Sequence, residues 1–173
     1  MTDARNRASG AGASRWRVDP ATSRISFEAR WMFGAHTARG VFERFAGWAT
    51  LHDDGSLVGE LTMDPSSVNT GIRLRDRHLQ NRLFLDSGNH PVITFMSRDI
   101  RLDGPSLTGA GHLVVRDRGV EVPLRGAVRI DAEQLTLSGS ATLDVRRFGW
   151  PTALGYIGRS LVVDGAISLE RHA

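Results

Sequence analysis

The chain lacks cysteine and lysine altogether, and it lacks any long hydrophobic run. The absence of cysteine excludes disulfide bonds, thiol catalysis and metal sites built from thiolates. Because no stretch of about 18 consecutive apolar residues occurs, the sequence contains no candidate transmembrane helix. We therefore predict no stable insertion into a membrane.

All 22 basic side chains are arginines, and the formal net charge is only +3. The isoelectric point near 10.7 therefore follows from the high pKa of arginine more than from a large charge excess. The arginines are spread along the chain and often neighbour acids, as in Arg75-Asp76 and Asp117-Arg118. A surface that binds nucleic acid needs arginines clustered with exposed aromatics, so no nucleic-acid partner is predicted.

The length of 173 residues, with 40% apolar and 24% charged side chains, suits one globular domain with a full core. Residues 1–14 are rich in Gly, Ala, Ser and Arg and contain no apolar stretch that could form the core of a signal peptide. We predict a disordered tail over residues 1–14, a domain over residues 15–173 and a cytoplasmic location.

Most of the domain alternates between apolar and polar residues, the pattern of half-buried strands. Residues 24–33 are the clearest case, with Ile25, Phe27 and Ala29 on one face. In residues 37–51 the alternation is less strict, which suggests a bulge near Gly40 or Gly47. Eight strands are predicted, over residues 24–33, 37–51, 57–63, 92–102, 107–115, 120–130, 135–145 and 161–169.

Consecutive strands with short connections are antiparallel neighbours, and eight of them can close into a barrel or fold into a sandwich. Closure removes exposed edges. An eight-stranded barrel is just wide enough to be filled by side chains or to hold one small ligand. The predicted fold class is all-β, an eight-stranded antiparallel barrel with a short helical insert.

Several glycines fall in the apolar, inward-facing register of their strands. Each either leaves room inside the barrel, because a side chain is missing, or marks a corner or bulge that lets the sheet coil. Both interpretations stay open at this point. Room inside would be apolar and aromatic and would suit a hydrophobic molecule. These glycines are Gly59, Gly109, Gly111, Gly126, Gly139 and Gly165.

The helical pattern lies within residues 69–97, where Ile72, Leu79 and Leu83 share one face of a 3.6-residue repeat. Residues 69–71 supply turn and capping chemistry in front of this helix. Arg73 and Arg77 stand four residues apart and repel each other unless an anion lies between them. That anion is either Asp76 or the head group of a ligand, and a solvated basic face is the ordinary alternative.

Residues 146–158 break the alternation before the last strand and are too apolar for an ordinary solvated loop. Three interpretations fit this segment: a lid over the barrel mouth, a subunit contact in a homodimer, or simple packing on the barrel end.

Several segments together resemble the YceI family of lipid-binding, lipocalin-like barrels. They are WRVDPATSRISFEAR, RGVFERFAG, GHLVVRDRGVEVPLRG, RRFGWPTALGYIG and, most specifically, SSVNTGIRLRDRHLQNRLFLDSGNHPVITFMS. The last is similar to the family's Arg-Asp-x-x-Leu, Phe-x-Asp and Pro-x-x-x-Phe-x-Ser series in order and spacing. The similarity covers residues 16–170, nearly the whole chain.

The resemblance implies a barrel with a helical cap and an elongated apolar cavity for a polyisoprenoid, such as an isoprenoid quinone or a prenyl phosphate. It implies neither a reaction nor a catalytic cofactor. Trp31 stands where family members often have a histidine, and the secretion signal that many members carry is not seen here. The predicted ligand-binding residues are Phe27, Trp31, Phe33, Phe42, Arg75, Leu79, Phe84, Phe95, Phe148 and Ile157.

Two other functions are weighed against lipid binding. An enzyme could use the region of Asp76 and His78, although the six histidines show no spacing typical of metal ligands, and no metal is predicted. The second alternative function is nucleic-acid binding by an OB-like barrel. The aromatic residues named above also suit a core that plugs the barrel ends.

Overall fold

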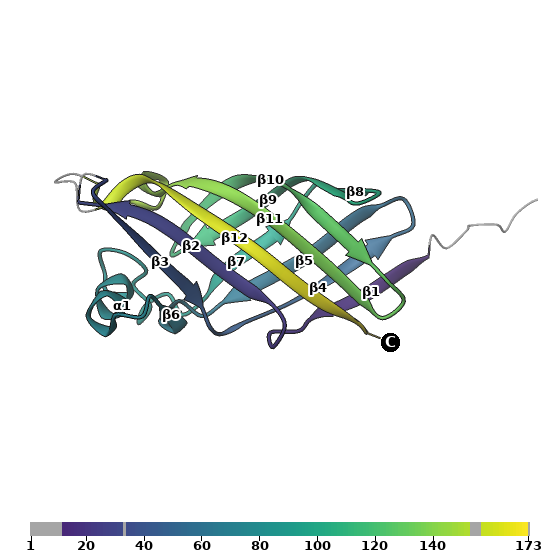
Figure 1. Cartoon of the computed structure of the whole chain (residues 1–173), viewed down its shortest axis with the longest axis horizontal. Coiled ribbons are helices and arrows are strands. Elements are labelled where there is room, and N and C mark those ends of the chain that lie inside the picture. The colour runs from purple at the N-terminus through teal and green to yellow at the C-terminus, as the bar shows by residue number, and fades with distance from the viewer. Residues whose placement is uncertain (1–11, 33, 153–156, 173) are drawn as a thin grey trace, which may run out of the picture.

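The computed structural model describes residues 12–32, 34–152 and 157–172, most of which lie in β-strands (Figure 1). The helices are α1 (Arg73–Gln80) and the short 3-10 helices η1 (Pro65–Ser67) and η2 (Val145–Phe148). The strands are β1 (Ala13–Val18), β2 (Arg24–Trp31), β3 (His36–Phe42), β4 (Phe45–His52), β5 (Ser56–Met63), β6 (Val68–Asn69), β7 (Ile93–Ser97), β8 (Ile100–Asp103), β9 (Ser106–Val115), β10 (Arg118–Ile130), β11 (Gln134–Asp144) and β12 (Ile157–His172).

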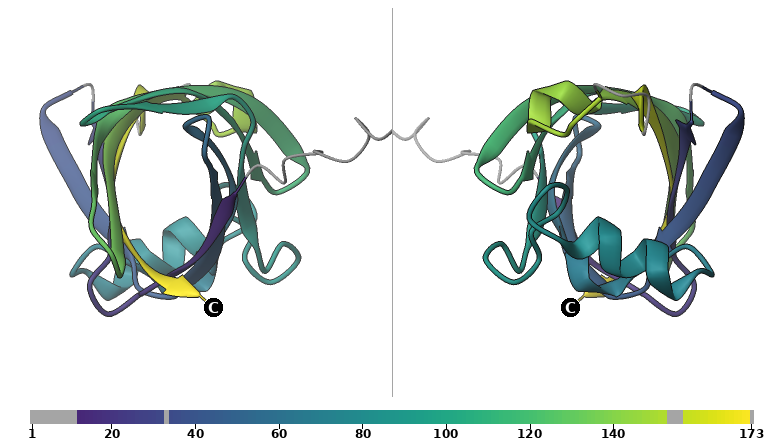
Figure 2. Two further views of the ribbon diagram at one scale, coloured as in Figure 1. Left: turned by 90° about the vertical axis from the view of Figure 1, so that its right-hand side faces the viewer. Right: turned by 90° about the vertical axis from the view of Figure 1, so that its left-hand side faces the viewer.

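Antiparallel pairing closes the sheet into a barrel of eight strands. The order around the barrel is β1, β4, β5, β7, β9, β10, β11 and β12, and β12 pairs back to β1. The ring of strands is visible from either end in Figure 2. This confirms the predicted fold class, an all-β antiparallel barrel with one short helical insert.

Strand β12 has 16 residues and pairs with two different strands along the same edge. Its first part, from Ile157 to Ala166, pairs with β2, and its last part, from Leu169 to His172, pairs with β1. Where the partner changes, the Ser168 N–H donates to Ser23 Oγ at 2.9 Å. The barrel therefore closes through β1 at one end, while β2 and β3 extend the sheet at the other.

Two of the predicted strands are each divided in the structure. The strand predicted over residues 37–51 is β3 and β4, with a break at Glu43 and Arg44 rather than a bulge at Gly40 or Gly47. The strand predicted over residues 92–102 is β7 and β8, and both pair with β5 and β9. Between β7 and β8 the chain keeps the same two neighbours and the ladder is interrupted at Arg98 and Asp99, whose N–H groups both donate to the Ala110 carbonyl. Between β3 and β4 the partners change from β2 and β6 to β1 and β5. Hydrophobic alternation alone reveals neither break.

Strand β1 was not among the predicted strands. Its residues Ala13 and Ser14 pair with β4, so this part of the tail predicted over residues 1–14 is ordered strand. Residues 1–11 lie outside the described residues. The strand is short, but Trp16 and Val18 point inward and are buried, and tertiary packing therefore explains its formation.

The core divides into two clusters at opposite ends of the barrel. The cap-end cluster lies near α1 and includes Phe27, Met63, Phe84, Leu85, Val115, Phe148 and Trp150. The far-end cluster consists of Trp16, Val18, Ala49, Leu57, Ile100, Leu107, Val128, Leu135 and Leu169. Trp16 is 2% exposed, and the Arg171 guanidinium lies 5.3 Å from the centroid of its ring.

Helix α1 and the coil after it form the cap segment, residues 70–91, at one end of the barrel (Figures 1 and 2). The predicted apolar face was wrong, because Ile72 is 52% exposed and Leu83 is 57% exposed. Only Leu79 of the three packs against the cap-end cluster. The predicted capping was also wrong: Ile72 is the N-cap and makes no side-chain hydrogen bond.

Replacing Trp16 with alanine should test the far-end cluster. We expect Trp16→Ala to lower the free energy of unfolding by about 3–5 kcal/mol, because a large buried ring is lost. Trp48 is a matched control, since it is 49% exposed. Trp48→Ala should cost about 1 kcal/mol or less. If chemical denaturation showed equal losses of unfolding free energy for the two variants, Trp16 would not be a main contributor to the far-end cluster.

Candidate functional site

A cavity of about 250 Å³ lies inside the barrel between the two core clusters. Its lining is almost entirely aliphatic and aromatic. Phe42, Phe95, Phe148 and Trp150 line it, together with residues of the far-end cluster. The interior is therefore hollow and apolar, and it offers a bound molecule hydrophobic contact and little else.

Three glycines form a row across β10, β11 and β12, because Gly126 pairs with Gly139 and Gly139 pairs with Gly165. Gly139 and Gly165 line the cavity. A Cβ added at Gly165 would meet only Ile167 Cγ1, at 3.9 Å, so this position faces open space. Gly126 differs, since an added Cβ would clash with the Ser138 carbonyl oxygen.

None of the remaining predicted glycines leaves room for a side chain. Gly59 lines the cavity, but a Cβ added there would clash with the Trp48 carbonyl oxygen, so its role is the close approach of β4 and β5. The inward space beside Gly111 is occupied, because the Phe95 ring lies over it. Gly109 has φ +147° and lies against the backbone of Asp99. Room and sheet coiling are thus both present, at different glycines, and Gly59, Gly109, Gly111 and Gly126 do not open the cavity.

Helix η2 places two aromatic side chains at the cap end of the cavity. Asp144 caps this helix by accepting hydrogen bonds from Arg146, and these bonds lower the pKa of the Asp144 carboxyl to about 2. Gly149 then adopts a left-handed conformation with φ 75°, which ends the helix and turns the chain inward. As a result Phe148 is 1% exposed and Trp150 is 9% exposed.

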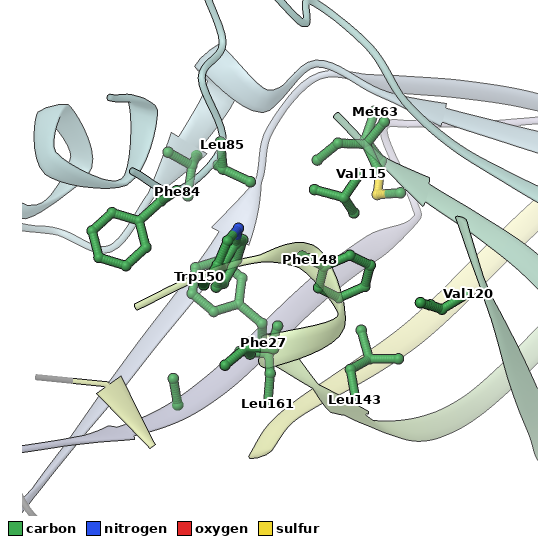
Figure 3. Close-up of a cluster of buried hydrophobic side chains, with 14 of the residues drawn as sticks. Phe27, Met63, Phe84, Leu85, Val115, Val120, Leu143, Phe148, Trp150 and Leu161 are labelled. Carbon is green, nitrogen blue, oxygen red and sulfur yellow. The ribbon is translucent and has the colours of Figure 1, made fainter. Parts of the chain in front are cut away.

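Trp150 carries the one polar group in this part of the lining that has no partner. Its indole Nε1 is buried, and no atom of the described residues accepts its hydrogen. The ring packs edge-on against Phe84, with the centroids 5.7 Å apart. In Figure 3 the nitrogen lies on the side of the ring that faces Leu85 of the cap segment. A buried N–H without an acceptor is costly, and an oxygen of a ligand would satisfy it.

Three of the predicted ligand-binding residues line the cavity, namely Phe42, Phe95 and Phe148. Phe33 lies outside the described residues. Four of the other predicted apolar residues pack next to the lining: Phe27 packs against Phe42, Phe84 packs against Trp150, and Leu79 and Ile157 pack against the cap-end cluster. Trp31 packs against His36 of the neighbouring strand β3 and does not line the cavity.

Arg75 does not reach the cavity lining but holds the cap segment in place. Its Nε donates to Thr70 Oγ1 at 2.9 Å, and its Nη2 donates to the Thr70 carbonyl oxygen at 2.9 Å. Asp76 accepts hydrogen bonds from the same residue, through the Thr70 N–H at 2.8 Å and the Thr70 hydroxyl. The Arg-Asp pair therefore clamps α1 to the end of β6.

The clamp bears on two earlier hypotheses. Asp76 makes no ion pair with Arg73 or Arg77 within the described residues, so it is not the anion expected between them. His78 is exposed and lies edge-on to Phe84, with ring centroids 6.0 Å apart. Asp76 and His78 thus serve packing and anchoring, and neither lines the cavity.

Titratable groups gather into no metal site in the parts of the chain that the structure describes. His90 lies between Asp86 and Asp117, with nitrogen–oxygen distances of 3.7 and 3.5 Å, and links the cap segment to the turn after β9. None of the helices in the described ranges combines the length and the apolar character that crossing a bilayer requires.

Sequence reasoning missed Trp150 and Leu85 as lining residues. Trp150 follows a Gly and precedes a Pro in a segment where the alternation has already stopped, so no strand pattern assigns it to a face. Leu85 belongs to the coil after α1, and its burial depends on the backbone bond from its N–H to the Leu79 carbonyl. Neither residue belongs to a periodic hydrophobic pattern, so nothing in the sequence indicated its position.

A closed antiparallel barrel with an apolar cavity and a helical cap defines a hydrophobic-ligand-binding barrel of the lipocalin-like class. The YceI-like domain model matches residues 16–172, so the chain belongs to the YceI-like family. A UPF0312 protein of Pseudomonas paraeruginosa is 27% identical over 135 residues, which cover 72% of this chain and 66% of that protein. The match thus spans slightly less than two thirds of that relative's length.

Solved structures share the fold. BcnA of Burkholderia cenocepacia has a TM-score of 0.79 and 17% identity, and the match covers 87% of this chain and 98% of that one. A polyisoprenoid binding domain from Saccharophagus degradans, implicated in plant cell wall breakdown, has a TM-score of 0.73 and 16% identity, covering 91% and 98%.

Removing the carboxylate of Asp76 should loosen the cap segment. Asp76→Ala leaves the Thr70 N–H and hydroxyl without their acceptor, so we expect a loss of about 1–3 kcal/mol in the free energy of unfolding. Hydrogen exchange should rise within residues 70–91. Asp54→Ala is the matched control, because Asp54 makes the same pair of bonds to Ser56 in the turn between β4 and β5. Unchanged exchange over the cap in Asp76→Ala would contradict the clamp.

Proposed function

We propose that this barrel is a non-catalytic carrier of an isoprenoid lipid that has an oxygen-bearing head group, with an isoprenoid quinone as the preferred ligand. The observation that supports this most is an apolar cavity whose lining includes a buried N–H donor, Trp150 Nε1, with no acceptor among the described residues. Family membership and the fold shared with a polyisoprenoid binding domain agree with it.

The tail of such a ligand would bind by hydrophobic burial. Burial contributes roughly 25 cal/mol per Å² of apolar surface, so a hydrocarbon chain needs no polar contact to bind tightly. Phe42, Phe95 and Phe148 supply large contact areas along the lining. A polar or charged ligand would lose its hydration and gain almost nothing in return.

The head group is argued from Trp150. A neutral carbonyl oxygen can accept from Nε1 at a small cost of desolvation, whereas a phosphate would carry its charge into an apolar site with one neutral donor. A polyprenyl phosphate would therefore have to keep its head group outside, near the arginines of the cap segment. This comparison favours the quinone over the phosphate.

The volume of the cavity restricts the length of the tail. At about 250 Å³ it lies slightly below the range of roughly 300–1,000 Å³ that is usual for ligand pockets. A short or medium prenyl chain fits this space better than a very long one.

Two further properties remain predictions. The homodimer can be tested by light scattering of the purified protein. The cytoplasmic location can be tested by fractionation of the cells that produce it.

The first test is mass spectrometry of an organic extract from freshly purified protein. We expect an isoprenoid lipid in about equimolar amount, and added quinone should displace it or bind to the delipidated protein. The absence of any lipid, together with no binding of added quinone, would refute the proposed function.

The second test fills the cavity. Gly165→Leu should fold, because its Cβ meets only Ile167, and should place its side chain in the space of the ligand. We expect ligand binding to fall at least about tenfold, since the leucine takes the site of the tail, with the free energy of unfolding unchanged or higher. Gly88→Leu is the control, because Gly88 is exposed and an added Cβ meets nothing. Full binding by Gly165→Leu would count against this site.

The third test removes the donor. Trp150→Phe keeps an aromatic ring but lacks the N–H, so we expect the affinity for a quinone to fall about three- to tenfold. The affinity for a prenyl hydrocarbon without oxygen should fall less, because that ligand makes no hydrogen bond. The ratio of the two affinities, measured by fluorescence titration, isolates the hydrogen bond from the change of ring size. An unchanged ratio would exclude Trp150 as the donor to the head group.

A further inference from the structure

The cap segment exposes apolar side chains beside arginines on its outer side. Leu74 is 76% exposed, and Ile72 and Leu83 are more than half exposed. We call this surface the docking face and define it by Ile72, Arg73, Leu74, Arg77, Arg82 and Leu83, all of which are exposed.

Helix geometry separates the docking face from the side that holds the barrel. Arg73, Leu74 and Arg77 lie at spacings of one, three and four residues and point to solvent, whereas Leu79 packs inward. The inward side is fastened by Asp76 to Thr70 and by Gln80, whose Nε2 donates to the Ser66 carbonyl oxygen at 3.0 Å. These bonds fix the orientation of α1 on the barrel, and Leu74 therefore stays exposed.

Positive charge is concentrated in this stretch. Residues 72–83 contain four arginines and one acid, Asp76, so twelve residues carry a formal excess equal to the +3 of the whole chain. The nearby carboxylates are engaged within the protein, since Asp76 accepts from Thr70, Glu43 from Asn69 and Asp86 from Asn89. These carboxylates keep their charge, but none of the salt bridges among the described residues includes Arg73, Arg77 or Arg82, so the guanidinium groups of the docking face stay available to an external anion.

We propose that the docking face binds the surface of an anionic lipid bilayer. Arginines that flank exposed leucine and isoleucine suit a surface whose head groups are negative and whose boundary region accepts apolar side chains. An acidic protein surface would match the arginines but would leave Leu74 and Leu83 without an apolar partner.

Docking in this orientation would bring the ligand cavity to the membrane. Leu85 follows the docking face by two residues and lines the cavity, and Phe84 packs on Trp150. Figure 1 shows the cap segment at one end of the barrel, so this end would face the lipid. The role in collecting or releasing an isoprenoid rests on the proposed function, whereas docking itself does not.

The test is co-sedimentation of the full chain with vesicles that contain no isoprenoid. We expect binding to vesicles containing phosphatidylglycerol and little binding to pure phosphatidylcholine, with added salt weakening it because the attraction is screened. Arg73→Glu with Arg77→Glu should reduce partitioning by about fivefold or more for each arginine. Leu74→Ser with Leu83→Ser should also reduce it, because the inserted apolar surface is lost.

Matched controls lie at the opposite end of the barrel. Arg125 and Arg129 are exposed on the outer side of β10, and Ile130 is 47% exposed beside the turn that follows. Arg125→Glu with Arg129→Glu, and Ile130→Ser, should leave partitioning unchanged. Equal binding to both kinds of vesicle, no binding to either, or equal losses in the controls would overturn the proposal. The proposal would also be overturned if the docking-face variants changed self-association in light scattering while vesicle binding stayed intact.

The two proposals can fail separately. Vesicle binding without any co-purified or added lipid in the cavity would leave the docking face intact and refute the carrier function. A bound isoprenoid without vesicle binding would refute docking alone. Lipid extraction and co-sedimentation on the same preparation distinguish these results.

Discussion

Hydrogen bonding along one edge of β12 to two partners closes the sheet, and the site depends on that closure. The first part of the edge bonds to β2 and the last part to β1, with Ser168 and Ser23 joined where the partner changes. A closed antiparallel sheet has an inside and an outside, and successive side chains along each strand point alternately to one and the other. At eight strands the inside is wide enough for a single layer of ligand or side chain.

Room inside the barrel is balanced against packing at its ends. Gly139 and Gly165 omit side chains at the middle level, and empty apolar space destabilises a protein because its lining loses contacts. Trp16 at the far end and Phe148 at the cap end are almost fully buried. The two clusters therefore stabilise the ends of the barrel, and several of their residues also line the cavity.

The cap segment joins binding inside to contact outside. Asp76 and Arg75 hold it to β6 through Thr70, which leaves Leu79, Phe84 and Leu85 toward the barrel. The same short stretch turns Leu74 and its neighbouring arginines to solvent. The coil after α1 is held against the end of the helix by backbone hydrogen bonds, such as the one from the Leu85 N–H to the Leu79 carbonyl. This folding back lets one short segment present residues both to the barrel and to solvent.

Alternation along the strands was enough to predict an antiparallel all-β fold with one apolar face per strand, because the period of two is a local property of extended chain. It left a barrel and a sandwich both open, and the removal of exposed edges and the family resemblance favoured the barrel. The same pattern could not separate Gly165, which opens space, from Gly126, which lies against a neighbouring carbonyl. Strand alternation assigned Trp150 to no face, and the helical repeat wrongly placed Ile72 and Leu83 on a buried face. Those outcomes depend on which distant backbone and which side chains arrive beside each residue. Only the closed tertiary structure decides that, because packing across the barrel is not encoded in any local period.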